Sequence, residues 1–270
     1  MQYKFLFPTY RNRYCFIRDA LKQYVKEQGQ FERGLNLGTG EGDYDSMVAA
    51  HCHTLIGCDI NADDLVFAKA FNSEVENLSY QVEDALALSF PDNHFDLIIS
   101  SEVIEHVGKP AQMIAEIGRV LKPGGLALMT YPSLEFPFTY DPINRILSWF
   151  SDRHISQGAF AFGHEYLISP QAFKEWVASE NLVLEKQRNL SGYIVGILEM
   201  YWTGWVQQIF KENAVNVSKQ EKKRLALRPS KKEPKLTVVT DSILSLDFSL
   251  FKNSRRAIGQ GIVLRKPITE

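Results

Sequence analysis

Apolar residues in the first half of the chain form short runs that alternate with longer amphipathic stretches. The run FDLIISS at 95–101 is continuous and rich in β-branched residues, which is typical of a strand buried on both faces of a parallel sheet. By the same pattern we expect strands at 34–37, 54–59, 78–82, 95–101 and 125–133. Helical periodicity predicts helices at 12–28, 44–50, 62–71 and 111–121. Such alternation predicts βαβ units with right-handed crossovers and a parallel sheet.

The second half of the chain is less regular. A helix is expected at 171–179, just after Pro170, and further strands at 182–187 and 261–265. LKPGG at 121–125 is expected to end the preceding helix and turn the chain. Residues 211–235 contain nine Lys or Arg and three Glu, a net charge of +6, which predicts a mobile loop or a solvated helix.

Composition places the chain among ordinary globular proteins. Its 270 residues, 45% of them hydrophobic, suit one domain with insertions. A net charge of −2 gives no overall bias toward nucleic acid. The three cysteines form no CxxC motif, which favours a reducing compartment. With no export signal and no apolar run of about 20 residues, the cytoplasm is the expected location.

Three glycines, Gly38, Gly40 and Gly42, follow the first expected strand at every second position. Glycine there lets backbone N–H groups approach a ligand, although a purely structural tight turn is the alternative. A turn that binds a dinucleotide prefers GxGxxG, whereas this chain has GxGxG with Asp43 at the expected helix start. Because an acid at that place competes with phosphate, the turn favours a ligand without a diphosphate.

Acidic residues end the next two expected strands. Asp59 is well placed to accept hydrogen bonds from ribose hydroxyls, unless it only caps the following helix. The pair Glu83 and Asp84 ends the third strand, where a carboxylate would accept from an adenine amino group. Together with the glycines, these acids indicate a nucleoside without a diphosphate.

Five segments in order and spacing carry a family resemblance: LNLGTGEG, CDIN, EDALALSFPDNHFD, EVIEHV and RVLKPGG. The chain resembles the class I S-adenosylmethionine-dependent methyltransferases over about residues 12–135, and more loosely in its last strands. The resemblance implies a Rossmann-like, doubly wound, mostly parallel seven-stranded sheet with helices on both faces and substrate-side insertions. Two residues depart from the family pattern: Asn36, where the family often has an acid, and Glu83, where glycine is common.

The same resemblance implies how S-adenosylmethionine would be bound. The backbone of the glycine turn would run past its methionine part at Gly38, Gly40 and Gly42. Asp59 would hold the ribose hydroxyls. Asp84 and the Ala85 backbone would read the adenine edge. Ser101 would lie beside the methionine amino group.

EVIEHV supplies the catalytic candidates Glu105 and His106. His106 is the first choice for a general base because its ordinary pKa is near neutrality, although a histidine here can also pack or cap. In ubiquinone-pathway O-methyltransferases and small-RNA 2′-O-methyltransferases, similar residues hold a divalent metal. That resemblance would give Glu102, Glu105, His106 and His164 as ligands for Mg²⁺, Mn²⁺ or Zn²⁺.

The variable segments are expected to choose the substrate. Tyr10, Arg11, Arg13 and Tyr14 would form an N-terminal lid, and aromatic segments at 130–142 and 153–166 would line a pocket or join the core. The apolar segment 193–210 is open to three interpretations: peripheral membrane contact, a homodimer interface or a core helix. The predicted division is a lid at 1–30, a cofactor-binding core at 31–190, an insertion at 191–258 and a final strand at 259–270.

The predicted function is methyl transfer from S-adenosylmethionine to a small-molecule acceptor, most readily at oxygen. An NAD-dependent dehydrogenase is disfavoured by GxGxG and LKPGG. A non-catalytic cofactor-binding or scaffold protein, or an enzyme acting on a lipid-linked or membrane-associated substrate, remains an alternative. RNA is a weaker candidate, because no RNA-binding module is visible.

Overall fold

The computed structural model describes residues 3–134, 142–151, 168–198, 233–254 and 256–268. The chain divides into two compact units. The core unit contains Tyr14–Pro132, Glu165–Arg188 and Gln260–Glu270. The insertion unit contains Met1–Arg13, Ser133–His164 and Asn189–Gly259.

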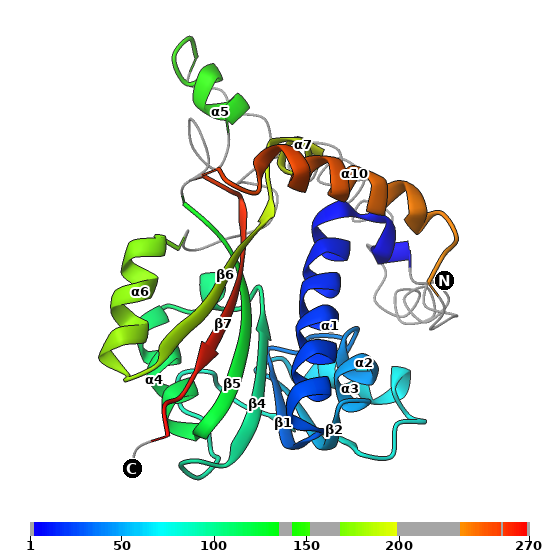
Figure 1. Ribbon diagram of the computed structural model, residues 1–270, viewed down its shortest axis with the longest axis vertical. Helices are drawn as coiled ribbons and strands as arrows, with labels where there is room; N and C mark the ends of the chain where they lie inside the picture. Colours follow the sequence, from blue (N-terminus) through cyan, green and yellow to red (C-terminus); the bar gives the residue numbers. More distant parts are fainter. Residues whose placement is uncertain (1–2, 135–141, 152–167, 199–232, 255, 269–270) are drawn as a thin grey trace. The chain divides into compact units, whose positions relative to one another are not determined.

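The described residues form one seven-stranded sheet with the order β3-β2-β1-β4-β5-β7-β6 (Figure 1). The four pairings among the first five strands in this order are all parallel. All seven expected strands are present: β1 (Phe31–Leu37), β2 (Cys52–Asp59), β3 (Leu78–Val82), β4 (Phe95–Ser101), β5 (Leu121–Pro132), β6 (Val183–Ser191) and β7 (Gly259–Arg265).

Strand β7 runs antiparallel to β5. Near the start of β5, Gly124 N donates to Lys266 O, just beyond the end of β7, over 2.8 Å. Immediately after β5, Ser133 N donates to Ile258 O, just before the start of β7, over 2.5 Å. The two strands therefore run in opposite directions, and the sheet is mostly rather than wholly parallel.

Helices cover both faces of the sheet in the core unit. In Figure 1, α4 (Pro110–Val120) and α6 (Pro170–Ser179) lie on one face. On the other face lie α2 (Asp45–Ala49), α3 (Ala62–Phe71) and the later part of α1 (Pro8–Gln28). Proline opens α4 and α6 at the first turn, where its missing N–H costs no hydrogen bond. All five predicted helices are confirmed.

The LKPGG segment ends the preceding helix as predicted, but its residues belong to strand β5 rather than to a separate turn. Helix α4 ends at Val120, and β5 begins directly at Leu121, so Pro123 and Gly124 lie within the first residues of the strand. Gly124 has φ 81°, and the β4–β5 register shifts between Phe95 and Leu97. The irregular start of β5 accommodates both residues, which explains why a strand was not expected there.

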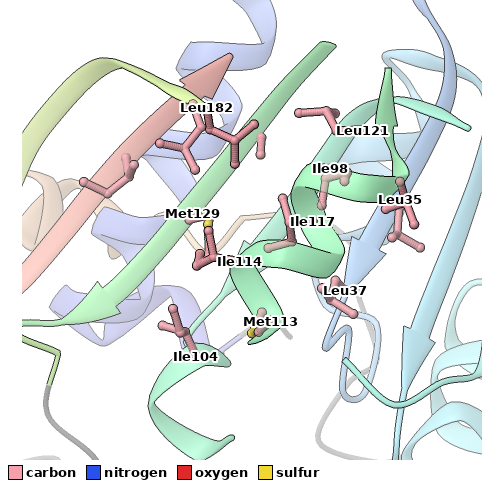
Figure 2. Close-up of a cluster of buried hydrophobic side chains, with 14 of the residues drawn as sticks. Leu35, Leu37, Ile98, Ile104, Met113, Ile114, Ile117, Leu121, Met129 and Leu182 are labelled. Atoms are coloured by element: carbon pink, nitrogen blue, oxygen red, sulfur yellow. The ribbon is translucent and has the colours of Figure 1, made fainter. Parts of the chain in front are cut away.

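A cluster of buried hydrophobic residues lies between the sheet and α4 (Figure 2). Helix α4 is amphipathic, and its buried face carries Met113, Ile114 and Ile117. Opposite them, β1 contributes Leu35 and Leu37, both no more than 1% exposed. This packing fixes the carboxyl end of β1, where the glycine turn begins.

The insertion unit contains η1 (Tyr3–Leu6), α5 (Pro142–Leu147), α7 (Tyr193–Ile197) and α10 (Thr237–Phe251). Arg11, which we expected in a lid, is 4% exposed and donates from Nε and Nη2 to Asp241 of α10 over 2.9 and 3.1 Å. Asp247 of α10 is 2% exposed and accepts hydrogen bonds from three amides at the start of α7: Gly192, Ile194 and Val195. Helix α10 is thus tied to both the N-terminal segment and α7.

Several sequence predictions lie outside the described residues. They concern His164, the segment 153–166, all but the ends of 130–142, residues 199–210 of the apolar segment and most of the basic stretch 211–235. None of the helices in the described part of the chain is long and apolar enough to span a bilayer.

Candidate cofactor-binding and catalytic site

The strand order reverses direction between β1 and β4, which makes the carboxyl ends of these strands the topological switch point of the sheet. The glycine turn follows β1 at this point. Gly38, Gly40 and Gly42 have φ values of 74°, 53° and 76°, in the left-handed region that favours glycine. The turn therefore needs glycine for its backbone conformation, whether or not a ligand approaches.

The three glycines differ in what surrounds them. A Cβ on Gly38 would lie 2.2 Å from Val103 Cγ2, and one on Gly42 would lie 2.8 Å from both Ala68 Cβ and Asn72 Nδ2. A Cβ on Gly40 would meet nothing within 4 Å. Gly38 and Gly42 are therefore required by packing as well as by φ, whereas Gly40 faces open space.

Asp59 lies beside this open position. Its Oδ2 accepts a hydrogen bond from Gly40 N over 2.8 Å, and its Oδ1 accepts one from Asn61 N over 2.9 Å. The N-terminus of α3 is capped by the side chain of Asn61, which accepts from Asp63 N over 3.1 Å. The cap is therefore Asn61, and Asp59 instead joins β2 to the glycine turn.

A buried polar cluster lies beneath the turn. Asn36, 3% exposed on β1, donates from Nδ2 to Asp45 Oδ1 over 2.6 Å and to Thr39 Oγ1 over 2.9 Å. Tyr80 on β3 donates its hydroxyl to Asp45 Oδ2 over 2.8 Å. Burial raises the pKa of Asp45, and the hydrogen bonds from Asn36, Thr39 and Tyr80 act in the opposite direction. Asp45 and Tyr80 lie outside the motifs of the sequence, and no role was predicted for either residue.

The loop after β3 contains the residues predicted to read adenine. Asp84 is exposed, and its Oδ1 accepts from Leu86 N over 2.8 Å, while Ala85 is half-buried. Glu83 is 7% exposed and accepts from the amide and the hydroxyl of Ser89 over 2.8 and 2.5 Å. Glycine at position 83 would lack these bonds, so the departure from the family pattern has a structural use.

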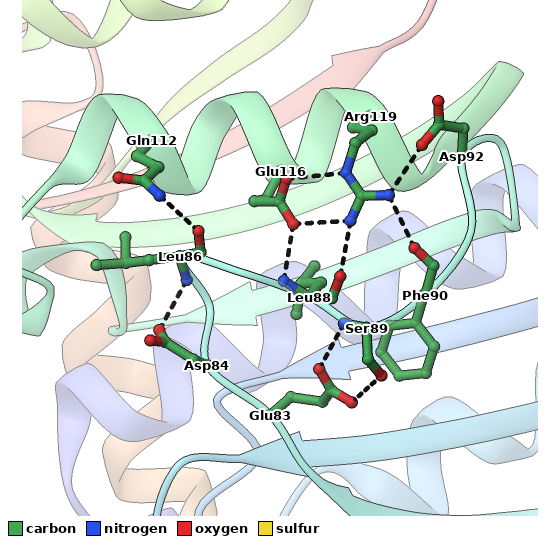
Figure 3. Close-up of polar contacts among 10 residues, drawn as sticks. All are labelled: Glu83, Asp84, Leu86, Leu88, Ser89, Phe90, Asp92, Gln112, Glu116 and Arg119. Carbon is green, nitrogen blue, oxygen red and sulfur yellow. Dashed lines mark hydrogen bonds and ion pairs between the residues drawn. The ribbon is translucent and has the colours of Figure 1, made fainter.

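Arg119 of α4 forms hydrogen bonds with the same loop (Figure 3). It donates to the carbonyl oxygens of Leu88 and Phe90, each over 2.8 Å. It also forms a two-point pair with Glu116, over 2.8 and 2.7 Å, and Glu116 in turn accepts from Leu88 N over 2.7 Å. The RVLKPGG motif contains Arg119, but only the structure shows that its guanidinium holds the loop near Asp84.

Ser101 and Glu102 stand at the end of β4. The Ser101 and Thr130 hydroxyls lie 2.9 Å apart, and Thr130 Oγ1 donates to Glu102 Oε1 over 3.1 Å. Glu102 has φ 57°, a left-handed conformation that is uncommon for residues other than glycine. Such backbone outliers cluster at functional sites, which marks the end of β4 as a candidate.

The catalytic candidates follow in η2 (Ile104–His106). The Glu105 side chain is fully buried, whereas the His106 side chain is 44% exposed. His106 Nε2 lies 4.0 Å from Glu105 Oε1, which is longer than a hydrogen bond. The exposed imidazole is the member of the pair that a substrate can reach directly.

Residues 35–129 match a family model described as a methyltransferase domain. Phosphoethanolamine N-methyltransferase 2 of Caenorhabditis elegans is 31% identical over 121 residues, which are 42% of this chain and 27% of that protein. The ubiquinone/menaquinone biosynthesis C-methyltransferase UbiE of Psychromonas ingrahamii is 29% identical over 189 residues, 63% of this chain and 74% of that protein. Residues 35–129 therefore match a methyltransferase domain, which supports the resemblance to the class I S-adenosylmethionine-dependent methyltransferases.

A solved structure with a similar fold is the [4+2]-cyclase SpnF, with a TM-score of 0.61 and 16% identity, covering 94% of this chain and 80% of that one. At this identity the likeness shows the fold alone. The chain spans 27% and 40% of the length of the first two curated relatives that it matches. Gly38, Asp59, Asp84, Ser101 and His106 all lie inside the matched methyltransferase domain.

The predicted metal ligands are only partly described. Within the described ranges, no group of three or more His, Cys, Asp or Glu side chains is arranged to hold a metal ion. His164, the fourth predicted ligand, lies outside those ranges. A metal held by Glu102, Glu105, His106 and His164 therefore stays a prediction.

Proposed function

We propose that the methyltransferase domain binds S-adenosylmethionine along the carboxyl ends of β1 to β4 and transfers its methyl group to a small-molecule acceptor, at an oxygen atom. The observation that carries this proposal is the hydrogen bond between Gly40 N and Asp59 Oδ2, at 2.8 Å. It places the open glycine and the candidate ribose-binding carboxylate next to each other.

The residues present fit this cofactor. A carboxylate has about four acceptor positions, so Asp59 can accept from ribose hydroxyls in addition to Gly40 N and Asn61 N. The space beside Gly40 lets a ligand approach the backbone closely. Asp84 and Ala85 would meet the adenine from a loop that Arg119 holds in place.

The cofactor, when bound, supplies a methyl group activated on a sulfonium. The protein then has to orient the acceptor and remove a proton from its hydroxyl. His106 is the candidate for taking that proton, because it is exposed and lies in η2, the short helix that follows the strand carrying Ser101. Glu105, fully buried beside it, is the second catalytic candidate.

The proposal of an oxygen acceptor depends on the assignment of His106 as a base and not on the names of the relatives. One relative is named as an N-methyltransferase and another as a C-methyltransferase. An exposed histidine favours an oxygen acceptor over a nitrogen acceptor, since a hydroxyl must lose its proton in the reaction whereas a free amine attacks without a base.

A second candidate is a non-catalytic or differently reacting protein with the same cofactor site. It is compatible with the site because the contact between Gly40 and Asp59 concerns cofactor binding and not methyl transfer. A lipid-linked substrate, with membrane contact or a homodimer through 193–210, remains a prediction, because only residues 193–198 of that segment are described.

The test is transfer of label from methyl-tritiated S-adenosylmethionine into a cell extract separated into polar small molecules, lipids, nucleic acid and protein. The wild type is compared with Asp59→Ala and with Glu76→Gln, which changes an exposed acid between α3 and β3. We expect label in the polar small-molecule fraction for wild type and Glu76→Gln, and little for Asp59→Ala. Label in lipids would favour the lipid-linked alternative, and cofactor binding without transfer would favour the scaffold.

A further inference from the structure

Asp45 is a fully buried carboxylate in the first turn of α2, and it accepts hydrogen bonds from three elements. Asn36 donates from β1 and Tyr80 from β3. Thr39 Oγ1, in the glycine turn itself, lies 2.7 and 2.8 Å from the two carboxylate oxygens. The carboxylate thus joins the turn to strands on both sides of β2.

Two glycines leave room for this carboxylate. A Cβ on Gly42 would lie 2.9 Å from Asp45 Oδ2, and a Cβ on Gly57 of β2 would lie 3.2 Å from the same oxygen. A Cβ on Gly57 would also lie 2.7 Å from the Tyr80 ring, which itself contacts Asp45 through its hydroxyl. Side chains at either position would crowd the carboxylate, so the local sequence is shaped around it.

A further pair of hydrogen bonds supports the same turn. Asn72, 3% exposed after α3, donates from Nδ2 to Gly42 O over 2.9 Å and to the Tyr80 hydroxyl oxygen over 2.8 Å. Tyr80 can therefore accept from Asn72 while it donates to Asp45. The polar cluster holds both halves of the turn, through Thr39 and through Gly42.

We propose that Asp45 is a positioning residue for the cofactor. Through its hydrogen bonds with the Thr39 hydroxyl, its carboxylate fixes the backbone that presents Gly40 N to Asp59. This inference rests on the proposed function. Asp45 would set the geometry of the S-adenosylmethionine site without contacting the cofactor itself.

The pairing of one amide with one acid is the feature to test. Asn36→Asp would place a second carboxylate 2.6 Å from Asp45, and like charges at that distance cannot both ionise without strong repulsion. Asp45→Asn alone would put two amides together and remove the charge that strengthens the hydrogen bonds from Thr39 and Tyr80. The double variant Asn36→Asp with Asp45→Asn restores one acid and one amide in exchanged positions.

The experiment measures the dissociation constant of S-adenosylmethionine by calorimetry and amide hydrogen exchange of residues 38–44 in the free protein. Both are measured for wild type, the two single variants, the double variant and the control Glu76→Gln. We expect Asn36→Asp to weaken cofactor binding by at least about tenfold and to speed exchange in the turn. The double variant should recover to within about threefold of wild type in both readouts.

The double variant separates positioning from a merely structural contribution. Tight binding by Asn36→Asp, or a double variant no better than Asn36→Asp in either readout, would overturn the proposal. If the Asn36→Asp chain does not fold, Asp45→Asn decides, because its turn should exchange faster while exchange in β4 stays unchanged. If wild type binds no S-adenosylmethionine, the proposed function fails, and the exchange pattern still tests whether Asp45 fixes the turn.

Discussion

A Cβ added to Gly38 would lie 2.2 Å from Cγ2 of Val103, so the glycine turn after β1 is in direct contact with the segment after β4. This contact brings the candidate cofactor turn next to the candidate catalytic segment, which begins at Glu102. At Gly40, two residues later, a Cβ would meet no protein atom within 4 Å. Packing against Val103 therefore requires glycine at position 38, whereas the open space at Gly40 is available for a ligand.

Alanine substitutions at these two positions should have different effects. Gly38→Ala should lower the free energy of unfolding by about 3 kcal/mol, from left-handed strain and overpacking against Val103. Gly40→Ala should cost only about 1 kcal/mol, the strain alone, yet weaken S-adenosylmethionine binding at least about tenfold. Urea unfolding and calorimetry on both variants measure this. Wild-type affinity in Gly40→Ala would remove Gly40 from the binding site.

Replacing Arg119 should loosen the loop that carries Asp84. Arg119→Ala removes two hydrogen bonds to the Leu88 and Phe90 carbonyl oxygens and the pair with Glu116. We expect a loss of about 2 kcal/mol in unfolding free energy and faster amide exchange in residues 84–92. Arg119→Lys should recover little of this, since a lysine cannot form the two-point pair. Unchanged exchange in the loop would contradict the role assigned to Arg119.

Stability should depend on pH through Glu116. Hydrogen bonding from the Arg119 guanidinium lowers the pKa of Glu116 below its ordinary value of 4.5. A carboxyl with a lowered folded-state pKa contributes stability that is present above the unfolded-state pKa, and this stability is lost as pH falls through the folded-state value. Glu116→Gln should therefore be less stable than wild type at pH 7 by about 1 kcal/mol.

The difference between wild type and Glu116→Gln should shrink as pH falls below about 4.5. Urea unfolding of both proteins at several pH values between 3 and 7 provides the measurement, with Glu76→Gln as the exposed-acid control. A difference that stays constant over this range would mean that ionised Glu116 contributes no stability.

His106→Ala should separate chemistry from cofactor binding. If His106 takes the proton of the acceptor hydroxyl, kcat should fall about 10²- to 10⁴-fold while the dissociation constant of S-adenosylmethionine stays within about twofold of wild type. The measurement is a single-turnover rate with an acceptor found by label transfer, paired with calorimetry. An unchanged kcat would exclude His106 as the base, and an equal loss of binding would indicate a structural role.

The central strands could be predicted because buried parallel strands leave continuous apolar runs, as FDLIISS does in β4. The more exposed strands β3 and β6 were expected from weaker patterns, and they also formed. Helix α10 was missed because TVVTDSILSLDFSLF is rich in β-branched residues and carries no clear apolar stripe. Its side chains are fixed by partners distant in sequence, such as Arg11.

The candidate site was predicted in part. Gly40 and Asp59 were marked by their places after β1 and at the end of β2, and the structure joins them by a hydrogen bond. Asp45 carried no signal, because in EGDYDS it looks no different from Asp43. Only the folded chain shows that one of these acids is fully buried among donors from three elements.

We propose that the glycine turn and Asp59 form a site for S-adenosylmethionine. The most direct test is calorimetric titration of the purified protein with S-adenosylmethionine, S-adenosylhomocysteine and NAD. We expect micromolar, one-to-one binding of the first two and no binding of NAD. No heat with either S-adenosyl compound would exclude this site and leave the glycines with a role only in turning the chain.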